Sequence, residues 1–120
     1  MPGRLTTHVL DIAQGKPAAI LGIELRRIDA DGTSELLLRT VTNGDGRIED
    51  GPLLSGDAFT AGEYEMIFAV GDYFAGQPVA TTDPPFLDRV PVRFRIIDPE
   101  SHHHVPLLVS PWAYSTYRGS

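Results

Sequence analysis

The chain carries four histidines, and three of them, His102, His103 and His104, are consecutive. An imidazole with a pKa near ~6.5 can take up and return a proton at neutral pH, or bind a metal ion. Neighbouring side chains of a β-strand point to opposite faces, so only His102 and His104 share a side. Typical zinc sites need three or four convergent ligands, and no carboxylate with a recognisable ligand spacing accompanies these two. We therefore do not expect a metal site at this tract.

Further polar residues have side chains suited to catalysis, although none is conclusive alone. His8 lies in the middle of a strand-like segment, where a histidine is more often a hydrogen-bonded surface residue. Arg47 follows the turn Asp45-Gly46, a place where an arginine is usually solvated. Tyr117 and Arg118 lie close to the end, where chains tend to fray. Taken singly, these residues leave a structural role open.

The composition excludes several classes of function. Without cysteine there is no disulfide, thiolate metal site or cysteine nucleophile. The sequence has neither the Gly-x-Ser-x-Gly motif of serine hydrolases nor a phosphate-binding glycine loop. A net charge of −6 with dispersed basic residues argues against nucleic acid or an anionic membrane as a partner, and no apolar run is long enough to span a bilayer. We expect a cytoplasmic protein, with a periplasmic location left open by a removable export signal.

Short segments with period-two alternation, each closed by turn residues, follow one another along the chain. Such alternation is typical of antiparallel sheets with one packed and one solvated face. The expected strands are 5–11, 22–28, 36–41, 63–70, 89–97 and 104–109, with a last strand near 115–119, and 71–76 is the only helical candidate. The pattern predicts one all-β domain, residues 1–120, folded as a two-sheet sandwich of seven to eight strands with one short helix.

The segment 104–109 departs from this alternation because it is apolar on both faces. A sandwich has one inner face, so the second apolar face must meet something else, and contiguous exposed apolar surface usually marks an interface. We therefore predict a homo-oligomer whose subunits meet across this strand. Pro106 has no N–H to donate, which predicts a sheet edge or a bulge at that position.

Three segments resemble the 5-hydroxyisourate hydrolases of the transthyretin-like family. They are Leu5–Asp11 (LTTHVLD) with the following GKPA, Thr42–Arg47 (TNGDGR) and His102–Ser120 (HHHVPLLVSPWAYSTYRGS), in the family's order over nearly the whole chain. Hormone-binding transthyretins share the Ser-Pro-x-x-Tyr-Ser segment but lack the histidines and the final Tyr-Arg-Gly-Ser. His103 and Trp112 depart from the residues more usual in the family, and neither is expected to do chemistry.

The resemblance implies a transthyretin-like sandwich that assembles as a homotetramer, a dimer of dimers, with active sites between the dimers. It implies hydrolysis of 5-hydroxyisourate to 2-oxo-4-hydroxy-4-carboxy-5-ureidoimidazoline in urate degradation, without cofactor or metal. The family's active-site positions match His8, Arg47, His104, Tyr117 and Ser120, and of these His8, Arg47 and Tyr117 are also expected to bind substrate. His102 matches a frequent family histidine without an assigned role.

On this hypothesis His104 and His8 activate water and shuttle protons, with the choice of base left open. Arg47 would stabilise the oxyanion or hold a substrate carbonyl, because a guanidinium keeps its charge and offers fixed donors. Tyr117 would donate a hydrogen bond or pack on the heterocycle, and Ser120 would position substrate or water. Two alternatives stand beside the enzyme: a non-enzymatic transthyretin-like carrier of a small ligand, and an interaction domain without a ligand.

Overall fold

The structure is a computed structural model that describes residues 3–119. Within them the chain forms eleven strands, one α-helix, α1 (Val70–Ala75), and a 3-10 turn, Gly56–Ala58. The strands are β1 (Arg4–Thr6), β2 (Val9–Asp11), β3 (Lys16–Pro17), β4 (Gly22–Ile28), β5 (Ser34–Val41), β6 (Leu54–Ser55), β7 (Gly62–Ala69), β8 (Arg89–Ile96), β9 (His102–His104), β10 (Leu107–Val109) and β11 (Tyr114–Thr116). Among these residues there is no helix with the length and apolar character needed to cross a membrane.

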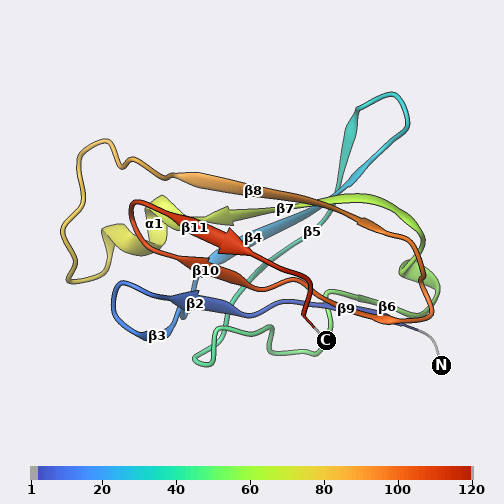
Figure 1. Cartoon of the computed structure of the whole chain (residues 1–120), viewed down its shortest axis with the longest axis horizontal. Coiled ribbons are helices and arrows are strands. Elements are labelled where there is room, and N and C mark those ends of the chain that lie inside the picture. Colours follow the sequence, from blue (N-terminus) through green and yellow to red (C-terminus); the bar gives the residue numbers. More distant parts are fainter. Residues whose placement is uncertain (1–2, 120) are drawn as a thin grey trace.

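The strands form two layers that pack face to face (Figure 1). One layer is an antiparallel sheet in the order β5-β4-β7-β8, called here the four-stranded sheet. The other, called here the histidine layer, joins the sheets β6-β1-β9 and β11-β10-β2-β3 end to end. The join is continuous because β9 and β10 run parallel to β1 and β2 in one constant register, from Arg4 opposite His102 to Val9 opposite Leu107. The predicted two-sheet sandwich is confirmed.

The core lies between the layers and is built from every second residue of the strands. On β7 the inward residues Tyr64, Met66 and Phe68 have no exposed surface. In the histidine layer Leu5, Val9, Leu107 and Val109 are equally buried. Residues between them point outward, so each strand of the histidine layer presents an alternate set of side chains to the outer face.

The predicted helix is present as α1, which follows β7 directly. The hydroxyl of Tyr73 on α1 donates to Asp11 Oδ2 at 2.8 Å. Asp11 Oδ1 also accepts from the backbone amides of Ala13 and Gln14, so this buried carboxylate closes the turn after β2. Burial, followed by the Asp11 carboxylate, raises the pKa of Tyr73 and keeps its phenol a donor.

Two expected strands are each divided in the structure. Strand 5–11 is interrupted at Thr7 and His8, and strand 104–109 at Val105 and Pro106. Pro106 lies buried between the end of β9, which is an edge strand of the sheet β6-β1-β9, and the start of β10, in agreement with the expected edge position. It is tolerated there because the amides of Val105 and Leu107 make the bonds to β1 and β2, whereas the hydroxyl of Thr116 donates to the Pro106 carbonyl at 2.7 Å.

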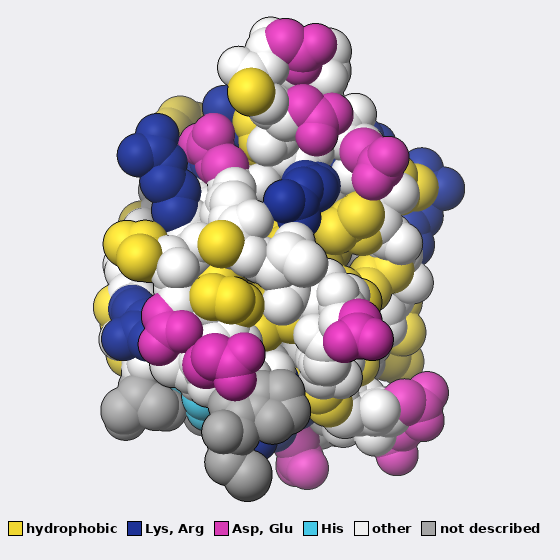
Figure 2. Space-filling view, turned by 90° about the vertical axis from the view of Figure 1, so that its right-hand side faces the viewer, with side chains coloured by type: hydrophobic (Ala, Val, Ile, Leu, Met, Phe, Trp, Pro, Cys, Tyr) yellow, Lys and Arg dark blue, Asp and Glu magenta, His cyan; other side chains and the backbone are white. Residues whose placement is uncertain are grey.

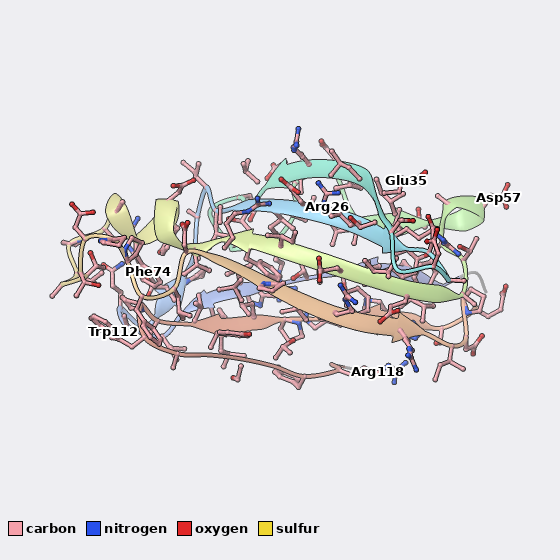
Figure 3. All side chains as sticks on the ribbon, turned by 90° about the horizontal axis from the view of Figure 1, so that it is seen from above. Arg26, Glu35, Asp57, Phe74, Trp112 and Arg118 are labelled. Atoms are coloured by element: carbon pink, nitrogen blue, oxygen red, sulfur yellow. The ribbon has the colours of Figure 1, made fainter. Side chains whose placement is uncertain are left out.

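Outward side chains differ between regions of the surface. The β4–β5 hairpin projects from the sandwich, and Figure 2 shows acidic side chains gathered at its tip, where Asp29 and Asp31 lie. The exposed Trp112, in the β10–β11 turn, and Arg118 lie at opposite ends of the final segment, with Arg118 near the end of β8 (Figure 3). His8, His102 and His104 belong to the outer face of the histidine layer, where the remaining polar residues of interest are found, whereas His103 is buried.

Candidate active site

The parallel pairing of β1 with β9 places Thr6 directly beside the histidine tract. Thr6 is in register with His104, and both residues alternate outward together with His102. The Thr6 hydroxyl oxygen lies 2.7 Å from His102 Nε2 and 2.8 Å from His104 Nδ1. The two imidazole centroids are 6.1 Å apart. One hydroxyl therefore bridges two imidazoles that face away from the core.

His8 is held by the turn that precedes Arg47. Its Nε2 lies 2.8 Å from the Asp45 carbonyl oxygen. Because a carbonyl can only accept, Nε2 carries a proton, which leaves Nδ1 as the ring nitrogen that faces no partner in this contact. The turn approaches β2 closely: the Val9 amide donates to the Gly46 carbonyl at 2.8 Å. Gly46 has a φ of +75°, and a Cβ there would collide with the Val9 carbonyl oxygen, so only glycine permits this approach.

The same turn positions Arg47. The Asn43 side-chain oxygen accepts from the amides of Asp45 and Arg47 at 2.9 and 3.1 Å, which fixes the backbone at the point where Arg47 leaves the turn. Arg47 lines a cavity of about 230 Å³ together with Arg4 and Thr6. Among residues 3–119, neither Arg4 nor Arg47 forms an ion pair with a carboxylate. These guanidinium groups are therefore available to an anionic or carbonyl group of a ligand.

Burial and neighbouring positive charge act together on the two bridged imidazoles. The pKa of His104 is lowered by burial first, and then by the charges of Arg47, His102 and His8. The pKa of His102 is lowered in the same way by burial, and then by Arg4, His103 and Arg118. Both rings are therefore neutral near pH 7, which is the form that accepts a proton.

The end of the chain passes over His104. The Gly119 amide donates to the His104 carbonyl at 2.7 Å in an isolated antiparallel bridge. A Cβ at Gly119 would lie 2.6 Å from His104 Cδ2, closer than any real Cβ contact. Glycine is needed here because of this close approach, and the terminal segment in turn restricts the orientation of the imidazole.

The structure brings together three of the five residues expected to carry the chemistry. His8, Arg47 and His104 lie on one face, close enough for Arg47 and His8 to lower the pKa of His104. Tyr117 is 59% exposed, lines a separate hollow of about 240 Å³ beside β8, and makes no hydroxyl hydrogen bond within residues 3–119. Ser120 lies outside the described residues. The catalytic roles of all five stay predictions.

Sequence reasoning missed four residues that shape this site: Arg4, Thr6, Gly46 and Gly119. Thr6 could have been found, since it lies two residues before His8 in an alternating strand and so shares its outward face. The two glycines could not, because the groups that they approach belong to distant segments.

No group of three or more histidine, cysteine or carboxylate side chains among residues 3–119 is arranged to hold a metal ion. The bridged imidazoles have a hydroxyl between them and arginines around them, and positive neighbours disfavour a cation. The arrangement is suited to moving protons and to binding a group that carries or develops negative charge.

A two-layer β-sandwich with this histidine and arginine cluster on one outer face defines a transthyretin-like protein with an acid–base site. The chain belongs to the HIUase/Transthyretin family, whose model matches residues 5–119. The predicted family membership is confirmed.

Bacterial relatives are similar over almost their full length. The chain is 57% identical to 5-hydroxyisourate hydrolase 2 of Rhizobium meliloti (strain 1021) over 119 residues, covering 98% of this chain and 97% of the relative. It is 58% identical to the 5-hydroxyisourate hydrolase of Mesorhizobium japonicum, covering 98% and 93%.

Solved structures of three kinds share the fold. The chain matches (S)-allantoin synthase with 51% identity and a TM-score of 0.94, covering 99% of this chain but only 44% of that longer one. It matches Klebsiella pneumoniae 5-hydroxyisourate hydrolase with 34% identity and a TM-score of 0.75, covering 98% and 99%. Sea bream transthyretin in complex with thyroxine matches with 30% identity and a TM-score of 0.84, covering 97% and 94%. Backbone likeness alone therefore does not separate these three kinds of protein.

Proposed function

We propose that this chain hydrolyses 5-hydroxyisourate to 2-oxo-4-hydroxy-4-carboxy-5-ureidoimidazoline, a step of urate degradation. The observation that carries the proposal is a neutral imidazole, His104, held by Thr6 beside Arg47, which has no carboxylate partner within residues 3–119. A general base and a fixed cation on one face are what water attack on a cyclic amide requires. The hydrolase relatives, more than 55% identical, support the same substrate.

In the proposed reaction His104 takes a proton from water as the water oxygen bonds to the amide carbonyl carbon. The carbonyl π electrons move to oxygen, and Arg47 stabilises the oxyanion with its fixed charge and donors. When the oxyanion collapses, the C–N bond breaks and the leaving nitrogen takes the proton back. No covalent intermediate with the protein forms.

His8 has a different part in this scheme. Its Nε2–H is engaged by the Asp45 carbonyl, so Nδ1 is the nitrogen left to accept a hydrogen bond from substrate or water. Because His8 lies close enough to lower the pKa of His104, it also helps to keep that base neutral. We propose His104 as the general base and His8 as a substrate-orienting group, with Tyr117 and Ser120 completing the substrate contacts.

We further propose that the enzyme acts as a homotetramer, a dimer of dimers, with the outer face of the histidine layer between dimers. In the isolated chain the cross-strand pair Leu10 and Leu108 lies on this face and is only half-buried, next to the imidazoles. An assembly would cover these leucines and exclude water from the site, which strengthens its electrostatics. Sedimentation velocity tests the assembly, and a monomer at micromolar concentration would contradict it.

A ligand carrier of the transthyretin type is the weaker candidate. The outer face carries imidazoles and guanidinium groups rather than the small and apolar side chains expected of a binding channel. Turnover decides between the two functions, because a carrier would leave the rate of substrate loss unchanged.

The test follows the absorbance of freshly generated 5-hydroxyisourate, with the spontaneous decay rate subtracted. The wild-type chain should accelerate the decay, and His104→Ala should lose most of this acceleration while it folds and assembles normally. Arg39→Gln is the control, because Arg39 lies on β5 in the other layer, paired with Glu24, and should leave turnover unchanged. Turnover by His104→Ala at the wild-type rate would remove the proposed base.

A further inference from the structure

The bridge formed by Thr6 limits where protons can lie in the site. A hydroxyl has one proton to donate and lone pairs to accept. Located between His102 Nε2 and His104 Nδ1, it satisfies both rings only by donating to one and accepting from the other. The tautomers of the two imidazoles are therefore coupled, and a change at one ring requires a compensating change at the other.

Of the two possible arrangements, one leaves His104 ready to act as a base. If Thr6 accepts from His104 Nδ1–H and donates to His102 Nε2, the lone pair of His104 is on Nε2. Among residues 3–119 the only hydrogen bond to the His104 ring is at Nδ1, so Nε2 is available to substrate or water. The same arrangement leaves His102 Nε2 as a proton acceptor at the other end of the bridge.

We propose that Thr6 and His102 form a proton relay behind His104, in which His102 holds the proton of the attacking water until the leaving nitrogen takes it. This inference rests on the hydrolase function proposed above and gives a role to a histidine that the reaction scheme left idle. Thr6 and His102 act through His104, so they are positioning residues.

The transfers balance. The water O–H bond breaks as the water oxygen bonds to carbon, and the proton goes to His104 Nε2. The proton on His104 Nδ1 passes to the Thr6 oxygen while the Thr6 hydroxyl proton passes to His102 Nε2. When the C–N bond breaks, the same steps run backwards: His102 returns its proton through Thr6 to His104 Nδ1, and His104 Nε2–H protonates the leaving nitrogen. Each turnover ends in the starting tautomers.

The surroundings favour such a relay over storage of the charge on His104. A proton held there would be next to Arg47 while the arginine is needed by the oxyanion, whereas transfer moves the charge to a ring centred 6.1 Å away. Arg4, His103 and Arg118 surround His102 as Arg47 and His8 surround His104, so burial and positive charge lower both pKa values in parallel. Because the pKa is lowered at both rings, each of them can give the proton back.

The test compares Thr6→Val, which removes the hydroxyl and keeps the shape, with Thr6→Ser, which keeps the hydroxyl. We expect Thr6→Val to lower kcat by about ten- to a hundredfold with KM changed less than about twofold, since acid–base help is worth about 10²–10⁴-fold in all. Thr6→Ser should stay within a few-fold of wild type. Thr40→Val on β5, in the other layer, is the matched control and should leave kcat unchanged.

Two readouts separate a relay from simple support of the imidazole. In mixtures of light and heavy water, a plot of the wild-type kcat against the deuterium fraction should be curved, because more than one proton moves in the transition state. The same plot should be linear for Thr6→Val. Nitrogen NMR should show that the tautomers of His102 and His104 change together in wild type. In Thr6→Val each ring should adopt its tautomer independently of the other. A linear dependence in wild type, or wild-type kcat in Thr6→Val, would overturn the relay and leave the hydrolase function intact. A wild-type chain without turnover would overturn the function and the relay with it.

Discussion

The two outer faces of this sandwich carry arginines in opposite electrostatic settings. On the four-stranded sheet, Glu24 contacts Arg26, Arg39 and Arg89 at 3.1–3.4 Å, and Arg26 projects from this face in Figure 3. On the histidine layer, Arg47 forms no ion pair within residues 3–119 and instead lowers the pKa of an imidazole.

This difference shows why one face is suited to catalysis and the other is not. A guanidinium that shares a carboxylate has much of its field cancelled at short range. A guanidinium beside a neutral imidazole keeps its field for an incoming oxyanion and also maintains the imidazole as a base. A larger hollow, of about 490 Å³, lies over Glu24 on the four-stranded sheet, so cavity size alone would indicate the face opposite to the proposed site.

The largest effect that separates the two faces is expected from neutralising one arginine on each. Arg47→Gln should lower kcat/KM by about 10²–10³-fold, because it removes the oxyanion's charged partner. Arg39→Gln, on the four-stranded sheet, should stay within about twofold of wild type, since its charge is already paired. Initial rates of 5-hydroxyisourate loss measure both. Equal losses in the two variants would abolish the distinction between the faces.

A smaller loss of activity should follow from adding one methyl group at Gly119, against the ring of His104. Gly119→Ala places a Cβ 2.6 Å from His104 Cδ2, so the ring or the terminal segment must move. We expect kcat to fall by about ten- to a hundredfold, because small displacements of a base are costly. Gly22→Ala on the opposite face is the control, because its Cβ would meet only Ala69 at an ordinary 3.5 Å. Unchanged kcat in Gly119→Ala would show that the terminal segment does not orient His104.

The two faces should also differ in their effect on pH dependence. Because burial and Arg47 lower the pKa of His104, activity should be retained as pH falls through 6.5 and be lost only below that value. Arg47→Gln removes the second of these causes, so the acid limb of kcat/KM should move to higher pH. Arg89→Gln, whose charge acts on Glu24, should leave the limb in place. A profile from about pH 5 to 8 measures the shift, and an acid limb that stays fixed in Arg47→Gln would contradict it.

The smallest effect is expected at Glu24. Burial by itself raises the pKa of this carboxyl, but the Arg26 hydrogen bond and the charges of Arg89, Arg26 and Arg39 outweigh it, so the pKa is lowered from 4.5. Since the folded pKa is the lower one, the ionised carboxylate stabilises the fold above pH 4.5, and this is lost as pH falls through the folded value. Glu24→Gln should therefore lower the free energy of unfolding at pH 7 by less than about 1 kcal/mol. Urea unfolding at fixed protein concentration measures this free energy. The kcat of Glu24→Gln should equal that of wild type.

Much of the fold was predictable because short-range patterns determine it. The alternation of β4 and β7 and the turn residues that close them agree with the structure to within one or two residues. The breaks at Thr7 and Pro106 were not predictable, since both depend on contacts between strands about a hundred positions apart, such as the bond from the Thr7 hydroxyl to the Val105 carbonyl at 2.7 Å.

The residue types of the site were predictable, but the hydrogen bonds between their side chains were not. His102 and His104 were expected to share a face, and they do, because alternation in a strand is a local property. Thr6 between them was not expected, because only the parallel register of β1 with β9 brings its hydroxyl to both rings. Tyr117, exposed in the single chain, and Ser120, outside the described residues, stay predictions that an assembled structure with a bound substrate analogue would test.

By itself the sequence determined the all-β class, the outward alternation of the imidazoles and the absence of any thiol chemistry, because each follows from residue type or from spacing within a few positions. Only the tertiary structure decided that Arg47 lies beside His104 and that one hydroxyl couples two histidines. It also decided that Gly46 and Gly119 lie where a side chain would collide with a distant segment. Those relations depend on register between distant strands, which arises when the two layers bury their inner faces together.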